Sequence, residues 1–248
     1  MRPYNFGDHL SGIIVDRIVG QHVDFLELKA GYTGPGRLLG VGSILHYALD
    51  GDIIWGSGFR EAPSQEHRFR TLDVRAVRGP RTREHLLSMG IECPPVYGDP
   101  AILMAHLFPE FKRGAPLLDY IVIPNIGEMS CFSAYKNLVL PTEPWDQIIR
   151  KMLQSRLVIS SSLHGIIVAE SFGIPARLIK MTWIEALLKY QDYYESTGRP
   201  HFRYATSIQE ALKMGGEEPP HIDIQPLLDA FPWDYFDQTS QSPTHASG

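Results

Sequence analysis

The chain alternates short apolar runs with helix-like stretches, and a glycine or proline stands at almost every boundary between them. This alternation is typical of layered α/β folds, in which the strands of a parallel sheet are covered by helices. One unit is plain: a strand at 73–77, a helix that begins at Pro80 and ends at Gly90, and a further strand from Val96. Proline suits the first helical turn, where its missing N–H is not needed, and glycine commonly ends a helix.

A second group of the same kind has strands at 120–124, 156–160 and 176–179 and helices at 145–154 and 163–172. The stretch at 108–116 between the groups contains two prolines, a glycine and adjacent charges, which is typical of a linker. We therefore predict two small α/β lobes with a cleft between them, over 1–112 and 113–216. One continuous doubly wound sheet is the alternative. In the tail, 217–248, an apolar cluster at 227–236 predicts a terminal helix followed by a disordered end.

Charge narrows the class of partner. The 248 residues include 23 basic and 28 acidic ones, and the net charge of −5 argues against general nucleic-acid binding. The basic residues comprise 16 Arg and seven Lys, and seven of the Arg lie within 60–83 beside three acids, a local surplus of +4. Guanidinium groups bind carboxylate and phosphate oxygens two at a time. This window is therefore either a solvated, salt-bridged face or an anion site.

Targeting signals are few. The longest run without Asp, Glu, Lys or Arg has 13 residues, at 157–169, whereas a membrane span needs roughly 20 apolar residues. Residues 1–20 lack the apolar core of a signal peptide. Cys93 and Cys131 form no redox motif, and no histidine spacing matches a metal site. The sequence predicts a cytoplasmic protein with free thiols, no transmembrane segment and no metal.

The strongest candidate site is Ser160-Ser161-Ser162-Leu163-His164-Gly165, where a predicted strand meets a predicted helix. In α/β sheets ligands gather at the carboxyl ends of strands, and a helix amino terminus there offers free N–H groups to phosphate or carboxylate. Gly165 leaves room for a ligand to approach the backbone. His164 is then a general acid or base beside a bound anion. The plainer alternative is a serine run that caps the helix beside a packed histidine.

A second candidate lies at the matching place in the first unit, Val77-Arg78-Gly79-Pro80-Arg81-Thr82. Arg78 leaves the strand end, and Arg81 stands in the first helical turn. A cation there is repelled by the positive end of the helix dipole. A bound anion would remove this conflict, so the segment favours an anion site over purely structural arginines.

Three weaker features complete the pattern. Asn5-Phe6-Gly7-Asp8 is a tight-turn sequence, Gly56-Ser57-Gly58 could cradle a ligand, and the segment at 189–194 has aromatic rings that either stack on a sugar or cover a half-buried helix. Together with Gly98-Asp99-Pro100-Ala101 and the segment at 170–175, these motifs stand in an order that resembles the polysaccharide pyruvyl transferase family. The resemblance covers residues 5–200.

The resemblance implies two Rossmann-like lobes in a GT-B-like arrangement. It also implies transfer of a pyruvyl group from phosphoenolpyruvate to two hydroxyls of one sugar, which gives a cyclic ketal and needs no cofactor. The site residues that we expect are His164 as the catalytic residue; Arg78, Arg81, Ser161, Ser162, Leu163 and Gly165 for the donor; and Asn5, Gly7, Asp8, Gly56, Ser57, Lys189 and Asp192 for the acceptor or the cleft. Many members carry Arg where this chain has Ser162. The role of that Arg in holding the donor anion must fall to Ser161, Ser162 or an arginine elsewhere.

The expected partners are phosphoenolpyruvate and a saccharide acceptor, free or lipid-linked. A peripheral association with a membrane stays open, although no basic amphipathic helix supports it. Two alternatives stand beside this function. One is a GT-B-type glycosyltransferase that uses a nucleotide sugar, for which we see no base-stacking or ribose motif. The other is a non-catalytic module that binds a sugar or an anion, against which the placement of His164 counts.

Overall fold

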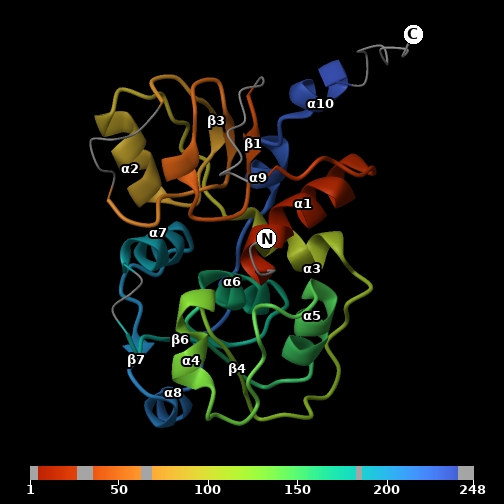
Figure 1. The fold of residues 1–248 in the computed structure, drawn as a ribbon, viewed down its shortest axis with the longest axis vertical. Coiled ribbons are helices and arrows are strands. Elements are labelled where there is room, and N and C mark those ends of the chain that lie inside the picture. The colour runs from red at the N-terminus through yellow and green to blue at the C-terminus, as the bar shows by residue number, and fades with distance from the viewer. Residues whose placement is uncertain (1–4, 27–35, 63–68, 183–185, 240–248) are drawn as a thin grey trace.

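A computed structural model describes residues 5–26, 36–62, 69–182 and 186–239. Within these residues the protein has two separate parallel sheets with helices around them (Figure 1). The first sheet has the order β1-β2-β3, and its strands are Leu38–Leu39, Ile53–Trp55 and Asp73–Ala76. The second has the order β4-β5-β6-β7, and its strands are Ile121–Ile123, Val158–Ser160, Ala176–Ile179 and Tyr204–Ala205. The predicted α/β class is confirmed, and the alternative of one continuous sheet is wrong.

The strands are short and buried because their sequences are nearly continuous apolar runs, as parallel sheets covered on both faces require. All strand pairings are parallel, with Val122 beside Ile159 in the second sheet. The strand predicted from Val96 is reduced to a single parallel bridge between Val77 and Tyr97.

The predicted helices at 80–90, 145–154 and 163–172 are confirmed, and further helices join them. The helices of the first half are α1 Phe6–Val19, α2 Pro80–Ser88 and α3 Met104–Leu107, with 3-10 turns η1 Leu45–Tyr47 and η2 Pro100–Leu103. Those of the second half are η3 Ile126–Glu128, α4 Met129–Phe132, α5 Trp145–Leu153, α6 Leu163–Ser171, α7 Leu188–Ser196 and α8 Ile208–Met214. Among these described helices, none has the length and apolar character needed to cross a membrane.

The predicted terminal helix is two short helices, α9 Gln225–Asp229 and α10 Trp233–Thr239. Pro232 stands between them, and a proline cannot donate the N–H that would continue α9. The end at 240–248, predicted to be disordered, lies outside the described residues.

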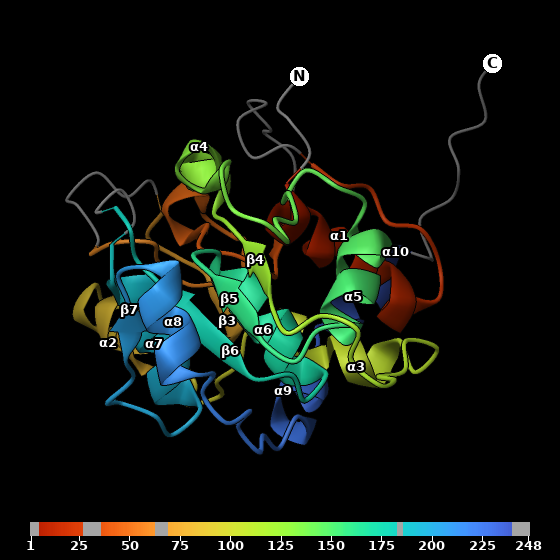
Figure 2. The same cartoon turned by 90° about the horizontal axis from the view of Figure 1, so that it is seen from below.

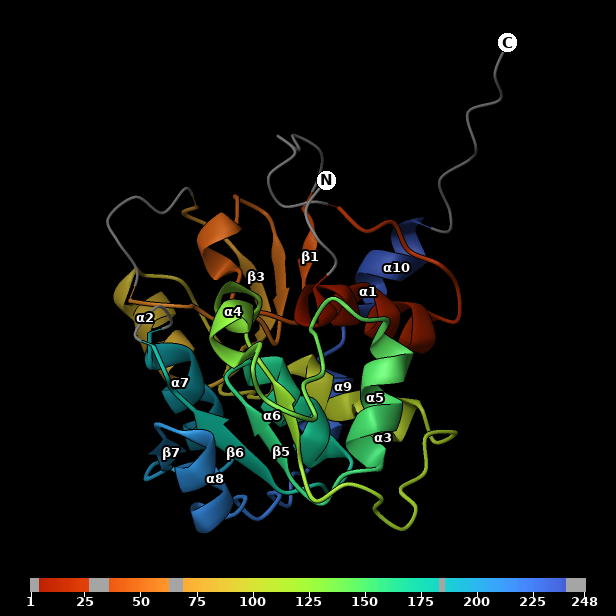
Figure 3. The same cartoon turned by 60° about the horizontal axis from the view of Figure 1, so that its bottom comes forward.

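The first and the last described helices each pack against elements of the other half of the chain. Helix α1 packs against α3, α5 and α6, at the level between the two sheets (Figures 1 and 3). Helices α9 and α10 return to the first sheet, where the indole N–H of Trp55 donates to the Leu227 carbonyl at 2.8 Å. The rings of Trp55 and Phe231 meet edge to face. These contacts cross the predicted boundaries at 112 and 216, which themselves stay a prediction.

Helices α6 and α8 cover the second sheet, whose strand ends carry the candidate site. Helix α6 packs against β5 and β6, and α8 packs against β6 and β7 (Figure 2). Helix α7 leaves this half of the chain and packs against α2 of the first half. The carboxyl ends of β5 and β6 therefore lie close to α1, α6 and α7.

Candidate functional site

The turn between β5 and α6 is fixed by serine. Strand β5 ends at Ser160, whose hydroxyl donates to the Ile123 carbonyl of β4 at 2.7 Å. The same oxygen accepts the N–H of Ser162 at 3.0 Å. Ser162 has an extended backbone and its side chain does not cap α6, so the helix begins with uncapped N–H groups in its first turn. The structure thus has the predicted strand-to-helix turn, without the serine cap.

The other members of this turn have structural contacts. Ser161 is buried, and its hydroxyl oxygen accepts the N–H of Asn125 at 2.9 Å. A Cβ on Gly165 would lie 2.4 Å from the Ser160 hydroxyl. The space beside Gly165, which we expected a ligand to use, therefore holds the hydroxyl of Ser160. Leu163 is buried in the core below.

His164 lies in the first turn of α6 and faces a buried carboxylate. Its Nε2 is 3.6 Å from Oδ2 of Asp99, and the two side chains are 13% and 0% exposed. Neither of these two buried atoms has a hydrogen-bond partner in the described part of the chain. The other oxygen of Asp99 accepts the N–H of Ala101 at 3.0 Å, which caps η2. This distance of 3.6 Å is that of an ion pair, longer than a hydrogen bond.

Sequence reasoning gave Asp99 no role, although its motif was part of the resemblance. The signal that would have found it is an aspartate between Gly98 and Pro100, a pattern that caps a helical turn and fixes the carboxylate. Gly56 helps to set this place, because a Cβ on Gly56 would lie 2.3 Å from the Pro100 ring. Its φ of +89° is also a conformation that favours glycine.

The amino terminus of α1 lies on the other side of the imidazole. A Cβ on Gly7 would lie 2.2 Å from Nδ1 of His164, so only glycine allows this contact. Asn5 is the N-cap but makes no side-chain cap, and Asp8 is exposed in the first turn. Two helix amino termini, of α1 and α6, therefore meet at His164. Their dipoles both favour an anion there.

Arg78 and Arg81 of the arginine motif pair with carboxylates of the same chain. Arg78 is fully buried, with Nε 3.0 Å from Asp192, Nη1 2.6 Å from the Ser43 hydroxyl and Nη2 2.5 Å from the Phe59 carbonyl. Asp192 of α7 also accepts the N–H and the hydroxyl of Thr82. A direct contact between Arg78 and a donor would require this buried cluster to open.

Arg81 is similarly paired but less enclosed. Its guanidinium makes two-point contact with Glu195 of α7, and its side chain is 44% exposed. The anions inferred from the arginines are thus carboxylates of α7. Ser57 is buried and donates to the Gly42 carbonyl, away from any opening. The donor and cleft roles of Arg78, Arg81, Ser57 and Asp192 stay predictions.

Two buried lysines flank the serine turn. The Tyr190 hydroxyl donates to the Ser161 carbonyl at 2.7 Å, and the Nζ atoms of Lys189 and Lys180 lie 5.0 Å and 6.0 Å from the Tyr190 ring centre. Lys189 was predicted from the sequence as a residue of the acceptor site or the cleft, whereas Lys180 was not predicted. The signal for Lys180 is a lysine directly after the apolar strand β6, next to β5 in the sheet. Over the described ranges, no group of three His, Cys, Asp or Glu side chains is arranged to hold a metal.

This is an α/β architecture whose candidate site lies at the carboxyl edge of a parallel sheet, as is common in α/β enzymes. The family model for polysaccharide pyruvyl transferases matches residues 43–180, more than half of the chain, and the chain belongs to that family. The match includes Asp99, Lys180 and the turn that carries His164. The resemblance inferred from the ordered motifs is thereby confirmed.

Two relatives align over most of their length. The succinoglycan biosynthesis protein ExoV of Rhizobium meliloti (strain 1021) is 28% identical over 240 residues, which cover 87% of this chain and 72% of that protein. The uncharacterized protein L143 of Acanthamoeba polyphaga mimivirus is 25% identical over 250 residues, 92% of this chain and 84% of that protein. No solved structure matches the chain.

Proposed function

We propose that this pyruvyl transferase moves the pyruvyl group of phosphoenolpyruvate onto two hydroxyls of one sugar, in a polysaccharide or its lipid-linked repeat unit. The product is a cyclic ketal. The observation that carries the proposal is His164, which lies between the Asp99 carboxylate and the amino termini of α1 and α6. The name of the relative from Rhizobium meliloti assigns that protein to succinoglycan biosynthesis, which supports a role in exopolysaccharide synthesis.

The donor carries a phosphate and a carboxylate, so its site must supply positive charge. The first-turn N–H groups of α6 supply part of it. Lys180 and Lys189, whose Nζ atoms lie 6.0 Å and 5.0 Å from the ring centre of Tyr190, supply the charge that an arginine in place of Ser162 gives other members. Arg81, with its partly exposed guanidinium, is the candidate contact from the first half. The buried Arg78 instead holds α7 in place through Asp192.

The reaction moves protons and carbon–oxygen bonds only, so it proceeds without a redox cofactor or a resident metal. In the first step a sugar hydroxyl adds to C2 of the donor, and the methylene carbon C3 gains a proton and becomes a methyl group. In the second step the neighbouring hydroxyl bonds to C2 as the phosphate leaves with the remaining proton. His164 accepts the proton of an attacking hydroxyl and returns it to C3 or to the phosphate. Asp99 holds the ring and stabilises its charged form.

We place this reaction between two Rossmann-like lobes in a GT-B-like arrangement, in the cytoplasm. The two parallel sheets support this view, because each has helices on it and the candidate site lies where α1, α6 and α7 meet. The sugar hydroxyls then meet the donor beside His164, where Asp99 of the first half faces α6 of the second.

Phosphate release tests the proposal. We expect the protein to release phosphate from phosphoenolpyruvate only when a saccharide repeat unit, free or lipid-linked, is present. His164→Ala should lower kcat by about 10²- to 10⁴-fold, the usual contribution of an acid–base group. His201→Ala is the matched control, because His201 is exposed.

Two results would contradict the proposal: no release with any acceptor, or an unchanged rate in His164→Ala. A thermal-shift comparison separates the nucleotide-sugar alternative. A larger rise in Tm with a nucleoside diphosphate than with phosphoenolpyruvate would favour a glycosyltransferase.

A further inference from the structure

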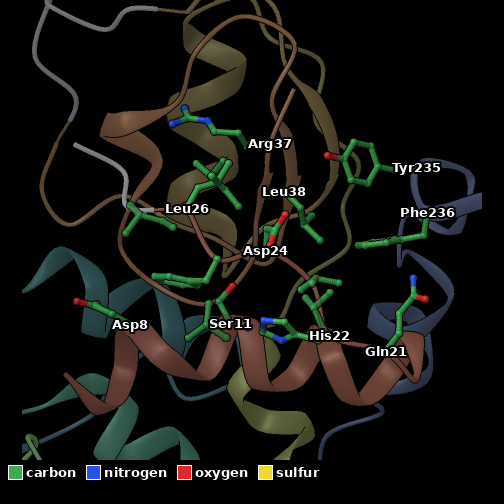
Figure 4. A pocket seen from close by; sticks show the side chains of 17 residues that line it. Asp8, Ser11, Gln21, His22, Asp24, Leu26, Arg37, Leu38, Tyr235 and Phe236 are labelled. Atoms are coloured by element: carbon green, nitrogen blue, oxygen red, sulfur yellow. The ribbon is translucent and has the colours of Figure 1, made fainter. Parts of the chain in front are cut away.

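A cavity of about 770 Å³ runs along the outer side of α1 (Figure 4). The segment at 21–26, strand β1 and helix α10 form its other walls. Small-molecule sites generally have about 300–1,000 Å³, so this cavity has the size of a binding site. His164 does not line it, and it is therefore distinct from the donor site described above.

Helix α1 divides its faces between the core and this cavity. Phe6, Leu10 and Ile14 point into the core. Ser11 and Gly12 line the cavity. The side chain of Ser11 is small and Gly12 has none, so this face of the helix adds little bulk to the cavity. A Cβ on Gly12 would lie 3.5 Å from the ring of Phe25. A larger side chain at this position would fill the cavity that the fold leaves open.

The chemistry of the walls favours a neutral ligand rich in hydroxyl groups. Asp8 and Asp24 bring carboxylates, and His22 brings an imidazole paired with Asp16. Phe25, stacked on His9, brings a ring that is 51% exposed. The guanidinium of Arg37 is bound to Asp52, with Nη2 2.5 Å from Oδ2. Carboxylates repel the anionic donor, whereas they accept hydrogen bonds from hydroxyls. An aromatic ring beside carboxylates therefore suits a sugar, whose C–H groups pack on the ring and whose hydroxyls donate to the carboxylates.

The position of the cavity links it to the reaction. Asp8 lies at one end of it and Gln21 at the other (Figure 4). Asp8 directly follows Gly7, the residue in contact with His164. Helix α1 has 14 residues, and at 1.5 Å per residue it is about 20 Å long. A saccharide of more than one unit laid along the cavity would have one end beside the amino terminus of α1, which packs on the histidine.

We propose that this cavity binds the acceptor saccharide, with the sugar that receives the pyruvyl group at the Asp8 end and further units along α1. This inference rests on the proposed function, because it assigns a place to the acceptor of that reaction. The carboxylates and the Phe25 ring select a neutral saccharide at this end, while the donor stays at the α6 terminus.

Binding without chemistry tests the cavity by itself. Saturation-transfer NMR would measure methyl β-D-glucoside, methyl β-D-galactoside and 1-octanol against the full chain, with no phosphoenolpyruvate present. We expect transfer to at least one hexoside, reduced fivefold or more in Asp24→Ala and Phe25→Ala. Asp119→Ala and Leu117→Ala are matched controls, since Asp119 and Leu117 are 92% and 76% exposed outside the cavity. His164→Ala should bind the hexoside as the parent does.

The proposal is overturned by transfer to 1-octanol alone, by no transfer to either hexoside, or by equal signals in the cavity and control variants that keep the parent Tm. With the full reaction, the cavity variants should raise KM for the saccharide about tenfold and leave KM for phosphoenolpyruvate unchanged. Hexoside binding that depends on Asp24 and Phe25 without any phosphate release would reject the proposed reaction and support the saccharide site. Phosphate release with no effect of these variants would reject the cavity alone.

Discussion

Nε2 of His164 and Oδ2 of Asp99 lie 3.6 Å apart, and each is buried with no hydrogen-bond partner in the described residues. Buried polar atoms that lack partners lose their hydrogen bonds to water, so such a pair is costly to a fold unless it serves a site. Asp99 caps η2 in the first half of the chain, and His164 begins α6 in the second. The pair that the reaction needs therefore depends on how the two halves are held together.

Asp99→Asn keeps the shape of this contact and removes its charge. We expect kcat to fall about 10²-fold, at the low end of acid–base effects, with little change in Tm. Because Asp99 acts through His164, the ¹⁵N chemical shifts of the His164 ring should change as well. An unchanged kcat together with unchanged ring shifts would show that Asp99 does not position the histidine.

Gly7→Ala should displace His164, because the new Cβ would lie 2.2 Å from Nδ1. We expect kcat to fall at least tenfold while the helix itself is preserved. Gly114→Ala, outside the cavity and the candidate site, is the control, since a Cβ there would meet nothing within 4 Å. That control should leave kcat and Tm close to those of the parent. Equal activity in the two variants would argue against a catalytic contact at Gly7.

The Arg78–Asp192 pair is fully buried, whereas Arg81–Glu195 is partly exposed. Breaking a buried pair leaves an uncompensated charge, so Arg78→Met should lower the free energy of unfolding by about 3–5 kcal/mol. Arg81→Met should lower it by less than about 1 kcal/mol. Urea denaturation measures both. Similar small losses would mean that Arg78 is not the buried link between the β3–α2 turn and α7 that its contacts indicate.

His22 is hydrogen-bonded to Asp16 at 2.9 Å, and this bond, with the charge of Asp16, raises the pKa of His22 above its usual 6.5. The pair should therefore stabilise the cavity segment at acidic pH and lose that effect as pH rises through the folded value. NMR titration of the His22 ring should give a midpoint above 6.5, and Asp16→Asn should lower it. A midpoint that does not respond to Asp16→Asn would exclude this pairing in solution.

The two thiols should differ in reactivity. Cys93 is buried, and burial raises its pKa to about 11, while Cys131 is exposed. Because the thiolate is the reactive form, a disulfide reagent at neutral pH should modify Cys131 rapidly and Cys93 only after unfolding. Cys131→Ser should abolish the rapid phase. Rapid loss of two thiols from the native protein would contradict the buried position of Cys93.

The elements that could be predicted from the sequence are those with local start and stop signals. Pro80 begins α2 and the serine run precedes α6, because these signals act through neighbouring backbone groups. The same locality explains what the sequence could not show. The carboxylate that pairs with Arg78 belongs to Asp192, 114 positions away in the sequence. The positive charge of Arg78 therefore suggested an anion bound from outside the chain. Asp99 meets His164, and Lys180 meets Tyr190, only after the sheets are assembled, and no spacing along the chain predicts either contact.

The return of α9 to the first sheet also sets an order of events during synthesis. Trp55 is made early, yet the carbonyl that pairs with its indole belongs to Leu227, 172 positions later. The first sheet therefore leaves the ribosome without α9, and the Trp55 indole gains this partner only when almost the whole chain has been made.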